Sequence, residues 1–316
     1  MRPVFADPRS DVIFKKIFGE LAHKDLLVEL LNSLLELDDS RRIVDIEYLS
    51  PEQLPQHQGL RLSILDVRCT DARGTRYVVE MQIIEVEGFQ KRVVYNACKA
   101  YSSQLAVGAD YPALNDVIAV TLCAFELWPA GPGRPVVPML SHWRMIEQHH
   151  GAAGLPEVQY VFLELPKYAA GDQPETTADR WAYFFLKASS LQQVPAALSQ
   201  APYATALEVA RVANLTEAEG TEYERERMAV QDFRGGLSLA EKRGLETGIA
   251  QGMERGMERG MEQGRRDGLR AAIRDLAEVF GVVLTRAQEA EIDTMDLGQL
   301  EQTRLHLKQA RAWPVR

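Results

Sequence analysis

Asp66, Glu80 and Gln82 are oxygen-bearing side chains within one short stretch of the chain, and their types suit a hard metal ion. Hard cations such as Mg²⁺ take oxygen ligands, commonly one or two carboxylates completed by waters and phosphate oxygens. Two carboxylates held next to each other repel unless a cation lies between them. The three residues therefore predict a divalent-cation site, provided that the fold brings them together.

The local sequence pattern predicts that Asp66 and Glu80 meet across a β-hairpin. Residues 62–69 alternate apolar and polar types, and a β-rich run covers 77–84 after a turn-like Asp-Ala-Arg-Gly at 71–74. A three-residue loop at this turn places Asp66 directly opposite Glu80, and Gln82 then shares their face. Opposed residues have Cβ atoms about 4.5–5.5 Å apart, and like charges there destabilise the pair. A divalent cation would turn that cost into a binding site.

The same pattern allows a simpler interpretation, in which Asp66 and Glu80 lie on the solvated outer face of an amphipathic hairpin. Each carboxylate would then lie near an arginine such as Arg68 or Arg76. Exposed carboxylates are the common case in proteins. A one-residue error in the turn would also change the register and move the side chains to the other face.

Further phrases in the chain resemble a known family. The Asp66…Glu80-Met81-Gln82 spacing looks like the D…ExQ form of the PD-(D/E)XK signature, and specifically resembles the Rpn family of recombination-promoting nucleases and transposases. Over roughly residues 11–270 the likeness extends to DVIFKKIFGE, YLSPEQLP, KRVVYNACKAYSSQLAVGADYPAL, LELPKY and the glycine repeats of the tail.

This resemblance implies an α/β fold, with a restriction-endonuclease-like core of a mixed central sheet flanked by helices and a helical C-terminal extension. It implies that Asp66 and Glu80 hold Mg²⁺, or Mn²⁺ or Ca²⁺, and that Gln82 is catalytic where many relatives have lysine. It also places the DxxFK motif, here Asp11 and Lys15, beside the active site. A cation from that helix would then supply the charge that lysine supplies elsewhere.

Residues 89–105 have helical spacing, and one face of this predicted helix carries groups suited to DNA. Lys91, Arg92, Tyr95 and Gln104 lie there, and a helix packed behind the hairpin would direct them at a phosphate or a base. Arg92 is the best candidate because a guanidinium binds phosphate through two parallel hydrogen bonds. Tyrosines such as Tyr95 are more often core residues with a satisfied hydroxyl.

The composition restricts the class of protein. The chain has 316 residues with 46% hydrophobic types, enough for a sizeable core, and a net charge of −9 argues against a basic nucleic-acid binder as a whole. Residues 61–104 carry seven basic and five acidic side chains, so the candidate site is mildly positive. Three separated cysteines indicate neither a zinc site nor a disulfide framework. Without a charged-then-apolar leader or a bilayer-length apolar stretch, we expect a cytoplasmic protein.

The remaining chain is assigned by periodicity. We expect two helices within 9–37, strands at 43–49, 117–125 and 158–165, a substrate-side loop or peripheral insertion at 128–154, and an amphipathic closing helix at 177–198. These segments form a nuclease-like domain over residues 1–215.

Beyond residue 215 the composition changes. A charged helical connector is expected at 216–243, a segment with glycine at every fourth residue at 244–268, and a small helical module at 269–316. Each glycine costs a helix about 1 kcal/mol relative to alanine, which favours a flexible linker at 244–268. The mostly apolar residue after each glycine favours instead a helix that associates with another copy, giving a homo-oligomer.

Taken together, the residues and the resemblance predict a metal-dependent DNA endonuclease that acts in recombination or in defence against foreign DNA. The alternative is a catalytically weak or inactive protein of the same fold, acting as a DNA-binding or oligomeric scaffold or regulator. The intact Asp66 and Glu80 favour the enzyme, whereas Gln82 in place of lysine leaves the alternative open.

Overall fold

The computed structural model describes residues 3–37, 39–49, 65–105, 110–151 and 153–314, and of Leu65 and Asp66 it describes the backbone. The chain divides into two compact units, Met1–Asp232 and Phe233–Arg316. Residues 62–64, the predicted start of the first hairpin strand, lie outside the described residues.

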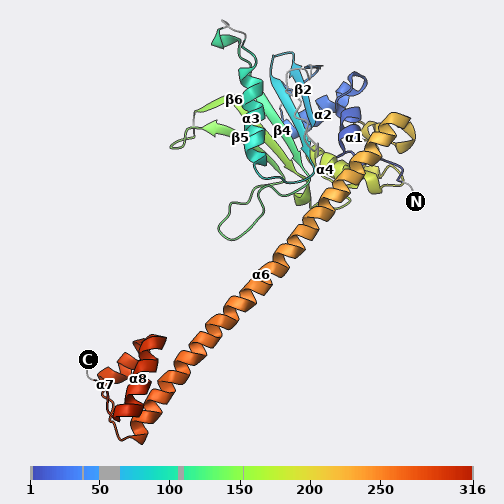
Figure 1. The fold of residues 1–316 in the computed structure, drawn as a ribbon. Helices are drawn as coiled ribbons and strands as arrows, with labels where there is room; N and C mark the ends of the chain where they lie inside the picture. Colours follow the sequence, from blue (N-terminus) through green and yellow to red (C-terminus); the bar gives the residue numbers. More distant parts are fainter. Residues whose placement is uncertain (1–2, 38, 50–64, 106–109, 152, 315–316) are drawn as a thin grey trace. The chain divides into compact units, whose positions relative to one another are not determined.

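A six-stranded mixed sheet forms the centre of the described part of the first unit (Figure 1). Its strands are β1 (Ile46–Tyr48), β2 (Leu65–Asp71), β3 (Arg76–Gln82), β4 (Val117–Cys123), β5 (Leu140–Ile146) and β6 (Gly154–Glu164). They lie in the order β1-β2-β3-β4-β6-β5. The three central strands β3, β4 and β6 are parallel, and the outer pairs are antiparallel.

Helices cover both faces of this sheet. They are α1 (Asp11–Phe18), α2 (Lys24–Leu35), α3 (Phe89–Ser102), α4 (Thr177–Lys187) and α5 (Tyr203–Val209), followed by α6 (Glu217–Val279), which begins in this unit. Helix α3 connects the parallel strands β3 and β4 and lies on one face, whereas α1, α2 and α4 lie on the other (Figure 1). This is the predicted class, a mixed sheet flanked by helices with a helical C-terminal region.

The larger core lies on the face covered by α1, α2 and α4. Phe14, Phe18 and Trp181 are fully buried there against strand side chains such as Val79 and Met81. Their rings contact one another, with the Phe18 and Trp181 centroids 5.6 Å apart. Burial of large aromatic side chains is the strongest single source of stability in a core. This face therefore fixes the positions of the strands.

The start of α1 is set by its own sequence. Ser10 has an extended backbone, and its side chain accepts a hydrogen bond from the amide of Ile13. Serine is a preferred residue at this position because it satisfies an amide that has no partner within the helix. This cap fixes where the Asp11–Lys15 motif begins.

The expectation of a loop or peripheral insertion at 128–154 is wrong in part. Residues Leu140–Ile146 form β5, an edge strand that pairs antiparallel with β6. Its ladder is interrupted between Trp143 and Met145, and most of its side chains are exposed. An exposed and irregular edge strand shows little alternation of apolar and polar types, which is why the periodicity did not reveal it.

The second unit consists of the rest of α6 with α7 (Arg286–Thr294) and α8 (Leu297–Ala310). A small core contains Ile273, Ile292, Met295, Leu300 and Leu307. Thr285 and Asp296 form capping boxes at the starts of α7 and α8. Leu305 of α8 is 54% exposed and lies outside this core.

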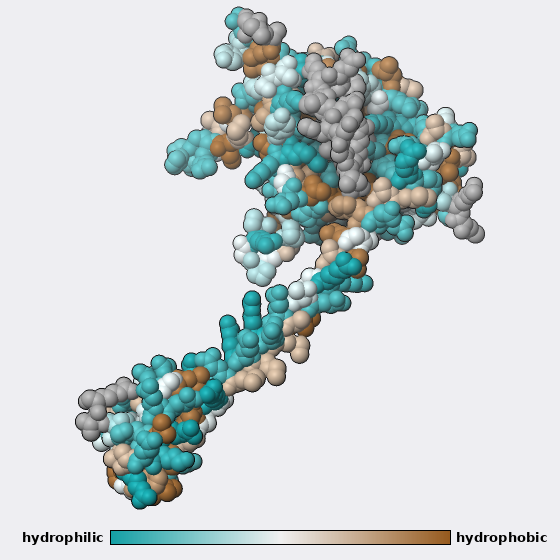
Figure 2. Space-filling model, in the orientation of Figure 1, coloured by the Kyte–Doolittle hydropathy of each residue, from teal (hydrophilic) through white to brown (hydrophobic). Residues whose placement is uncertain are grey.

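Residues 244–268, with their seven regularly spaced glycines, lie within α6. The residues after the first six of these glycines are exposed, and Figure 2 shows paler and hydrophilic side chains on different sides of this helix. Among the helices that the structure describes, none combines the length and the apolar character needed to cross a bilayer.

Candidate active site

The β2–β3 hairpin has the register that the sequence predicts. Asp66 pairs directly with Glu80, and the turn closes with the amide of Asp71 donating to the carbonyl of Thr75 at 3.1 Å. Gly74 has a φ of 88°, which is the left-handed region that glycine adopts without strain. The buried Asp71 carboxylate also accepts from the amides of Arg73 and Thr75. The turn chemistry therefore holds Asp66 and Glu80 on facing strands.

Glu80 and Gln82 are buried polar side chains on the α3 face of the sheet. They alternate along β3 with Val79 and Met81, which enter the larger core on the other face. Glu80 is 2% exposed and Gln82 is 1% exposed. A carboxylate or amide at such depth costs several kcal/mol unless it has partners. The solvated outer-face interpretation of Glu80 is therefore wrong.

Arg92 from α3 is the cation that contacts both of these side chains. Its Nη2 donates to Glu80 Oε1 at 2.7 Å and to Gln82 Oε1 at 2.6 Å. The guanidinium carbon also lies 5.2 Å from the centroid of the Phe89 ring, one turn earlier on the same helix. Arg92 thus neutralises the Glu80 carboxylate while remaining about a quarter exposed.

Both ends of the Gln82 amide are in use. Its Nε2 donates to the carbonyl of Ile84 at 2.6 Å, and its oxygen accepts from Arg92. This pair of contacts fixes which end of the amide is oxygen, because Arg92 is only a donor. Gln82 therefore acts as a rigid acceptor that orients Arg92, and one lone pair of its oxygen is left for a further donor.

A second buried acidic residue, which the sequence analysis did not single out, lies two strands away on the same face. Glu164 of β6 is fully buried and pairs through Oε1 with Lys167 at 2.7 Å. Its other oxygen accepts from the amides of Leu127 at 2.6 Å and Trp128 at 3.1 Å. Glu164 thus anchors the chain that follows β4. The sequence feature that could have revealed Glu164 is a carboxylate at the end of an apolar strand, three residues before Lys167.

Cys123 lies between these two polar centres, paired in register with Gln82 on one side and Glu164 on the other. Burial raises the pKa of the Cys123 thiol, and the nearby Glu164 and Glu80 carboxylates raise it further. The thiol therefore stays protonated at neutral pH.

The other residues predicted for the site have separate surroundings. Lys15 is exposed on α1, and the amide of Asp11 donates to Glu226 of α6 at 2.5 Å. On α3, Lys91 and Tyr95 are exposed. These positions leave their predicted roles untested.

Gln104 has a structural partner that its sequence position did not suggest. Its amide bridges the chain before β4, donating to the Asn115 carbonyl at 2.8 Å and accepting from the Asn115 amide at 3.0 Å. Since both amide groups of Gln104 are engaged, its contribution is to anchor the end of α3 to the start of the next strand.

The residues present fit a hard divalent cation. Glu80 offers a buried carboxylate, and Asp66 is paired with it on the neighbouring strand β2. Gln82 adds an amide oxygen. Oxygen donors of this kind are what Mg²⁺, Mn²⁺ and Ca²⁺ prefer. Among the side chains that the structure describes, no three His, Cys, Asp or Glu residues form a cluster able to hold a metal ion. The Asp66 side chain is not among them.

Comparison with known proteins identifies the family of the chain. The model of one protein family, described as PD-(D/E)XK nuclease family transposase, matches residues 8–240 and so includes the whole sheet and the start of α6. No curated protein and no solved structure matches the chain. Because the match covers most of the chain and contains the Asp66, Glu80 and Gln82 positions, the protein belongs to the PD-(D/E)XK nuclease family of transposases.

Proposed function

We propose that the protein is a divalent-metal-dependent DNA endonuclease whose site is centred on Asp66 and Glu80. The observation that carries the proposal is the buried Glu80 and Gln82 pair on β3, with Asp66 paired in register opposite Glu80. Family membership supports nuclease chemistry. A carboxylate buried in a polar site reduces stability, which makes Glu80 a candidate for a functional role.

Asp66 and Glu80 would hold the ion, which we take to be Mg²⁺ with Mn²⁺ or Ca²⁺ as substitutes. A bound ion of this type polarises the scissile phosphate and lowers the pKa of a bound water. Gln82 cannot be a general base, because an amide neither gains nor loses a proton at neutral pH. Its oxygen instead holds Arg92 and offers one further lone pair to an attacking water.

Arg92 would supply the fixed positive charge that lysine supplies in many relatives. The guanidinium reaches Glu80 and Gln82 together, so it lies beside the carboxylate that would hold the ion. It stays charged at any physiological pH and has several donors for the oxygens of a phosphate. A donor placed in advance where negative charge develops is commonly the largest contribution to catalysis. Arg92 therefore replaces α1 as our proposed source of the missing cation.

Plasmid cleavage tests the proposal directly. Wild type, Asp66→Asn, Glu80→Gln and the control Glu175→Gln would be assayed with Mg²⁺, Mn²⁺, Ca²⁺ or EDTA. Glu175 is an exposed carboxylate before α4, so its variant matches the change in charge away from the site. We expect cleavage with Mg²⁺ or Mn²⁺ in wild type and Glu175→Gln, and at least a 100-fold loss in the two site variants. Equal cleavage by all four proteins would refute the assignment.

One observation favours the alternative of a DNA-binding scaffold without turnover. Arg92 already neutralises Glu80, so the fold does not need an ion to keep this carboxylate buried. In that case the wild type would bind DNA and leave it intact under every metal condition. The same plasmid assay, followed by a gel-shift measurement, separates the two functions.

The cleavage would serve recombination or defence against foreign DNA, and the protein would act as a homo-oligomer formed through α6. The apolar residues after the glycines are 54–72% exposed, namely Leu245, Ile249, Met253, Met257 and Met261. A Cβ added at the glycines would meet no other atom, so another helix has room to approach closely there.

The charges beside this apolar stripe favour a parallel pair of helices. Glu254 and Glu258 follow the methionines on one flank, and Arg255 and Arg259 lie on the other. In a parallel two-fold pair the glutamate flank of one helix meets the arginine flank of the next, whereas an antiparallel pair would bring like charges together. Sedimentation analysis tests this: reversing both arginines to glutamate should weaken association, and mixing with a chain carrying both glutamates reversed to arginine should restore it.

A further inference from the structure

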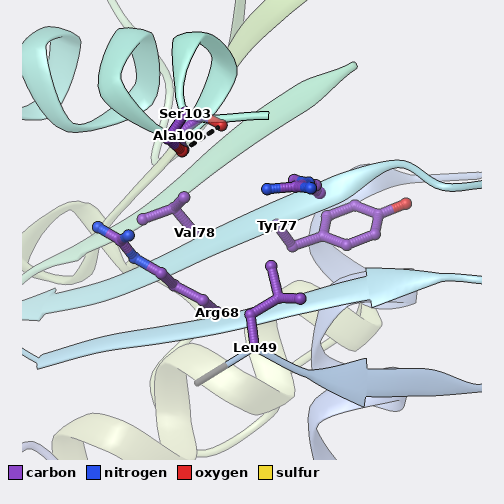
Figure 3. A pocket seen from close by; sticks show the side chains of 7 residues that line it. Leu49, Arg68, Tyr77, Val78, Ala100 and Ser103 are labelled. Atoms are coloured by element: carbon purple, nitrogen blue, oxygen red, sulfur yellow. Dashed lines mark hydrogen bonds between the residues drawn. The ribbon is translucent and has the colours of Figure 1, made fainter. Parts of the chain in front are cut away.

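A cavity of about 140 Å³ lies between the β2–β3 hairpin and the end of α3, on the same side of the sheet as Glu80. Arg68 and Arg76 line it together with Val78, Ala100 and Ser103. Figure 3 shows the Arg68 and Val78 side chains below the last turn of α3, which carries Ala100 and Ser103. Two guanidinium groups thus line one small open cavity.

The strand register connects this cavity to the candidate active site. Arg68 pairs with Val78, and the next same-face pair along the hairpin is Asp66 with Glu80. Residues two apart on a strand are separated by about 6.6–6.8 Å. Arg68 lies opposite Val78, which is two residues from Glu80, and Arg76 is four residues from Glu80 on the same strand. Each strand of duplex DNA carries a phosphate for about every 3.4 Å of helix axis. A DNA backbone that reaches Glu80 therefore presents further phosphates to the two arginines.

The charges around Arg76 differ from those around its neighbour Arg73. Among the described side chains, no carboxylate forms an ion pair or hydrogen bond with Arg76, whereas Arg73 nearby pairs with Asp71 at 2.8 Å. Burial lowers the pKa of the Arg76 guanidinium, with no acidic group acting against it. A partly desolvated cation without a partner reduces the stability of the fold. A phosphate group would supply the missing negative charge through charge-assisted hydrogen bonds.

A structural role at the end of α3 accounts for these arginines less well. Cations are favourable near the C-terminus of a helix, where carbonyl groups lack partners. Here the chain satisfies those carbonyls itself, because Lys99 accepts from the Ser103 amide and Ala100 accepts from the Ser103 hydroxyl. The carbonyl of Tyr101 accepts from the Gln104 amide. The last turn of α3 therefore does not require Arg68 or Arg76.

We propose that Arg68 and Arg76 form a phosphate-binding subsite that holds the DNA backbone next to the phosphate at Glu80. The subsite rests on the proposed nuclease function, because it assigns the substrate strand a path along the hairpin. Its contacts are made to phosphate oxygens alone, so it positions the DNA without reading its sequence.

The salt dependence of DNA binding tests the subsite. Fluorescence anisotropy with a labelled duplex in EDTA, and again in Ca²⁺, gives the slope of log affinity against log salt concentration. The proteins compared are wild type, Arg68→Gln, Arg76→Gln, the double variant, Arg76→Lys and the control Arg144→Gln. Arg144 is an exposed arginine of β5, so its variant makes the same charge change outside the cavity.

Each contact with a phosphate contributes about 0.9 to the slope. We expect the slope to become shallower by about one unit in each single variant and by about two in the double variant, independent of the DNA sequence. Arg76→Lys should keep the wild-type slope, and Arg144→Gln should not change it. Thermal unfolding midpoints should be unchanged or higher in Arg76→Gln, because an unpartnered charge is removed.

The outcomes separate the subsite from the nuclease function. If Arg76→Gln and the double variant bind with the wild-type slope while Glu80→Gln abolishes cleavage, the subsite is wrong and the nuclease function stands. If the slopes fall as expected while Glu80→Gln cleaves normally, the subsite stands and the catalytic assignment is wrong. If Arg76→Gln lowers the thermal unfolding midpoint and leaves the salt slope of DNA binding unchanged, Arg76 has a structural role instead. A wild type that binds no duplex in either condition refutes both.

Discussion

The two faces of the central sheet differ in what they bury, although the same strands supply both. On the face under α1, α2 and α4 the side chains are apolar and tightly packed, with Phe14, Phe18 and Trp181 fully buried. On the α3 face the apolar cluster is smaller, and Glu80 and Gln82 interrupt it on β3. The first face holds the strands in place, and the second uses that rigidity to hold polar groups at fixed positions.

The difference is clearest along β3 itself. Val79 and Met81 enter the large core, while Glu80 and Gln82, their neighbours in the chain, meet Arg92. Positioning a catalytic group requires supporting side chains that do not move. The apolar neighbours provide this support, so substitutions on the two faces should have different consequences. Four substitutions test this, in order of decreasing expected effect.

Trp181→Ala should lower the free energy of unfolding by about 4 kcal/mol, because it removes a fully buried indole and leaves a cavity in the larger core. Urea unfolding followed by circular dichroism measures the loss. The control Tyr95→Ala removes an exposed ring from α3 and should change stability by less than about 0.5 kcal/mol. Similar losses for both variants would mean that the two faces do not differ in packing.

Arg92→Ala should lower the free energy of unfolding by about 1–3 kcal/mol in EDTA, since it leaves the buried Glu80 carboxylate without its cation. Mn²⁺ should then stabilise this variant more than it stabilises wild type, because the ion replaces the lost charge. Arg92→Lys keeps a charge and should lose less. An equal Mn²⁺ effect in wild type and Arg92→Ala would show that the ion does not bind at Glu80.

Glu226→Gln should remove a pH dependence of stability of about 1 kcal/mol, discounted for partial exposure. Burial raises the pKa of Glu226 from 4.5 to about 7, and the nearby Asp11 carboxylate raises it further, although the Asp11 amide acts in the opposite direction. A carboxyl with a raised pKa stabilises the fold fully below pH 4.5, and this contribution is lost as the pH rises through about 7. Unfolding of wild type and variant at pH 5 and pH 8 measures it. If wild type gains stability relative to Glu226→Gln between pH 5 and pH 8, the predicted direction of this pH dependence is wrong.

Lys91→Gln should have the smallest effect, confined to DNA binding. The side chain is exposed on α3, so its loss should make the salt slope shallower by about one unit and leave stability unchanged. Gln104→Ala should have the opposite effect. The Gln104 side-chain amide forms two hydrogen bonds with the Asn115 backbone, so its loss should cost about 1 kcal/mol of stability and leave the salt slope unchanged. If Lys91→Gln lowers stability and Gln104→Ala changes the salt slope, Lys91 is the structural residue and Gln104 the one that contacts DNA.

Several features follow from short-range sequence alone, because their determinants are neighbours in the chain. The turn after Asp71 and the period-two alternation were sufficient for the register that pairs Asp66 with Glu80. Likewise, the helix caps Ser10, Thr285 and Asp296 depend on short-range sequence, because a cap acts on amides two or three residues away. The resemblance of longer sequence stretches to a known family added the prediction of a mixed sheet flanked by helices.

Other features depend on contacts between elements that are distant in the chain, and only the tertiary structure decided them. The edge strand β5 depends on pairing with β6, and the Glu164–Lys167 pair becomes informative only once the chain after β4 packs against it. The sequence singled out Arg92 as a candidate for phosphate, but its contact with Glu80 and Gln82 depends on how α3 packs against β3. Local patterns determine which face a side chain takes, whereas packing between layers determines which groups it meets there.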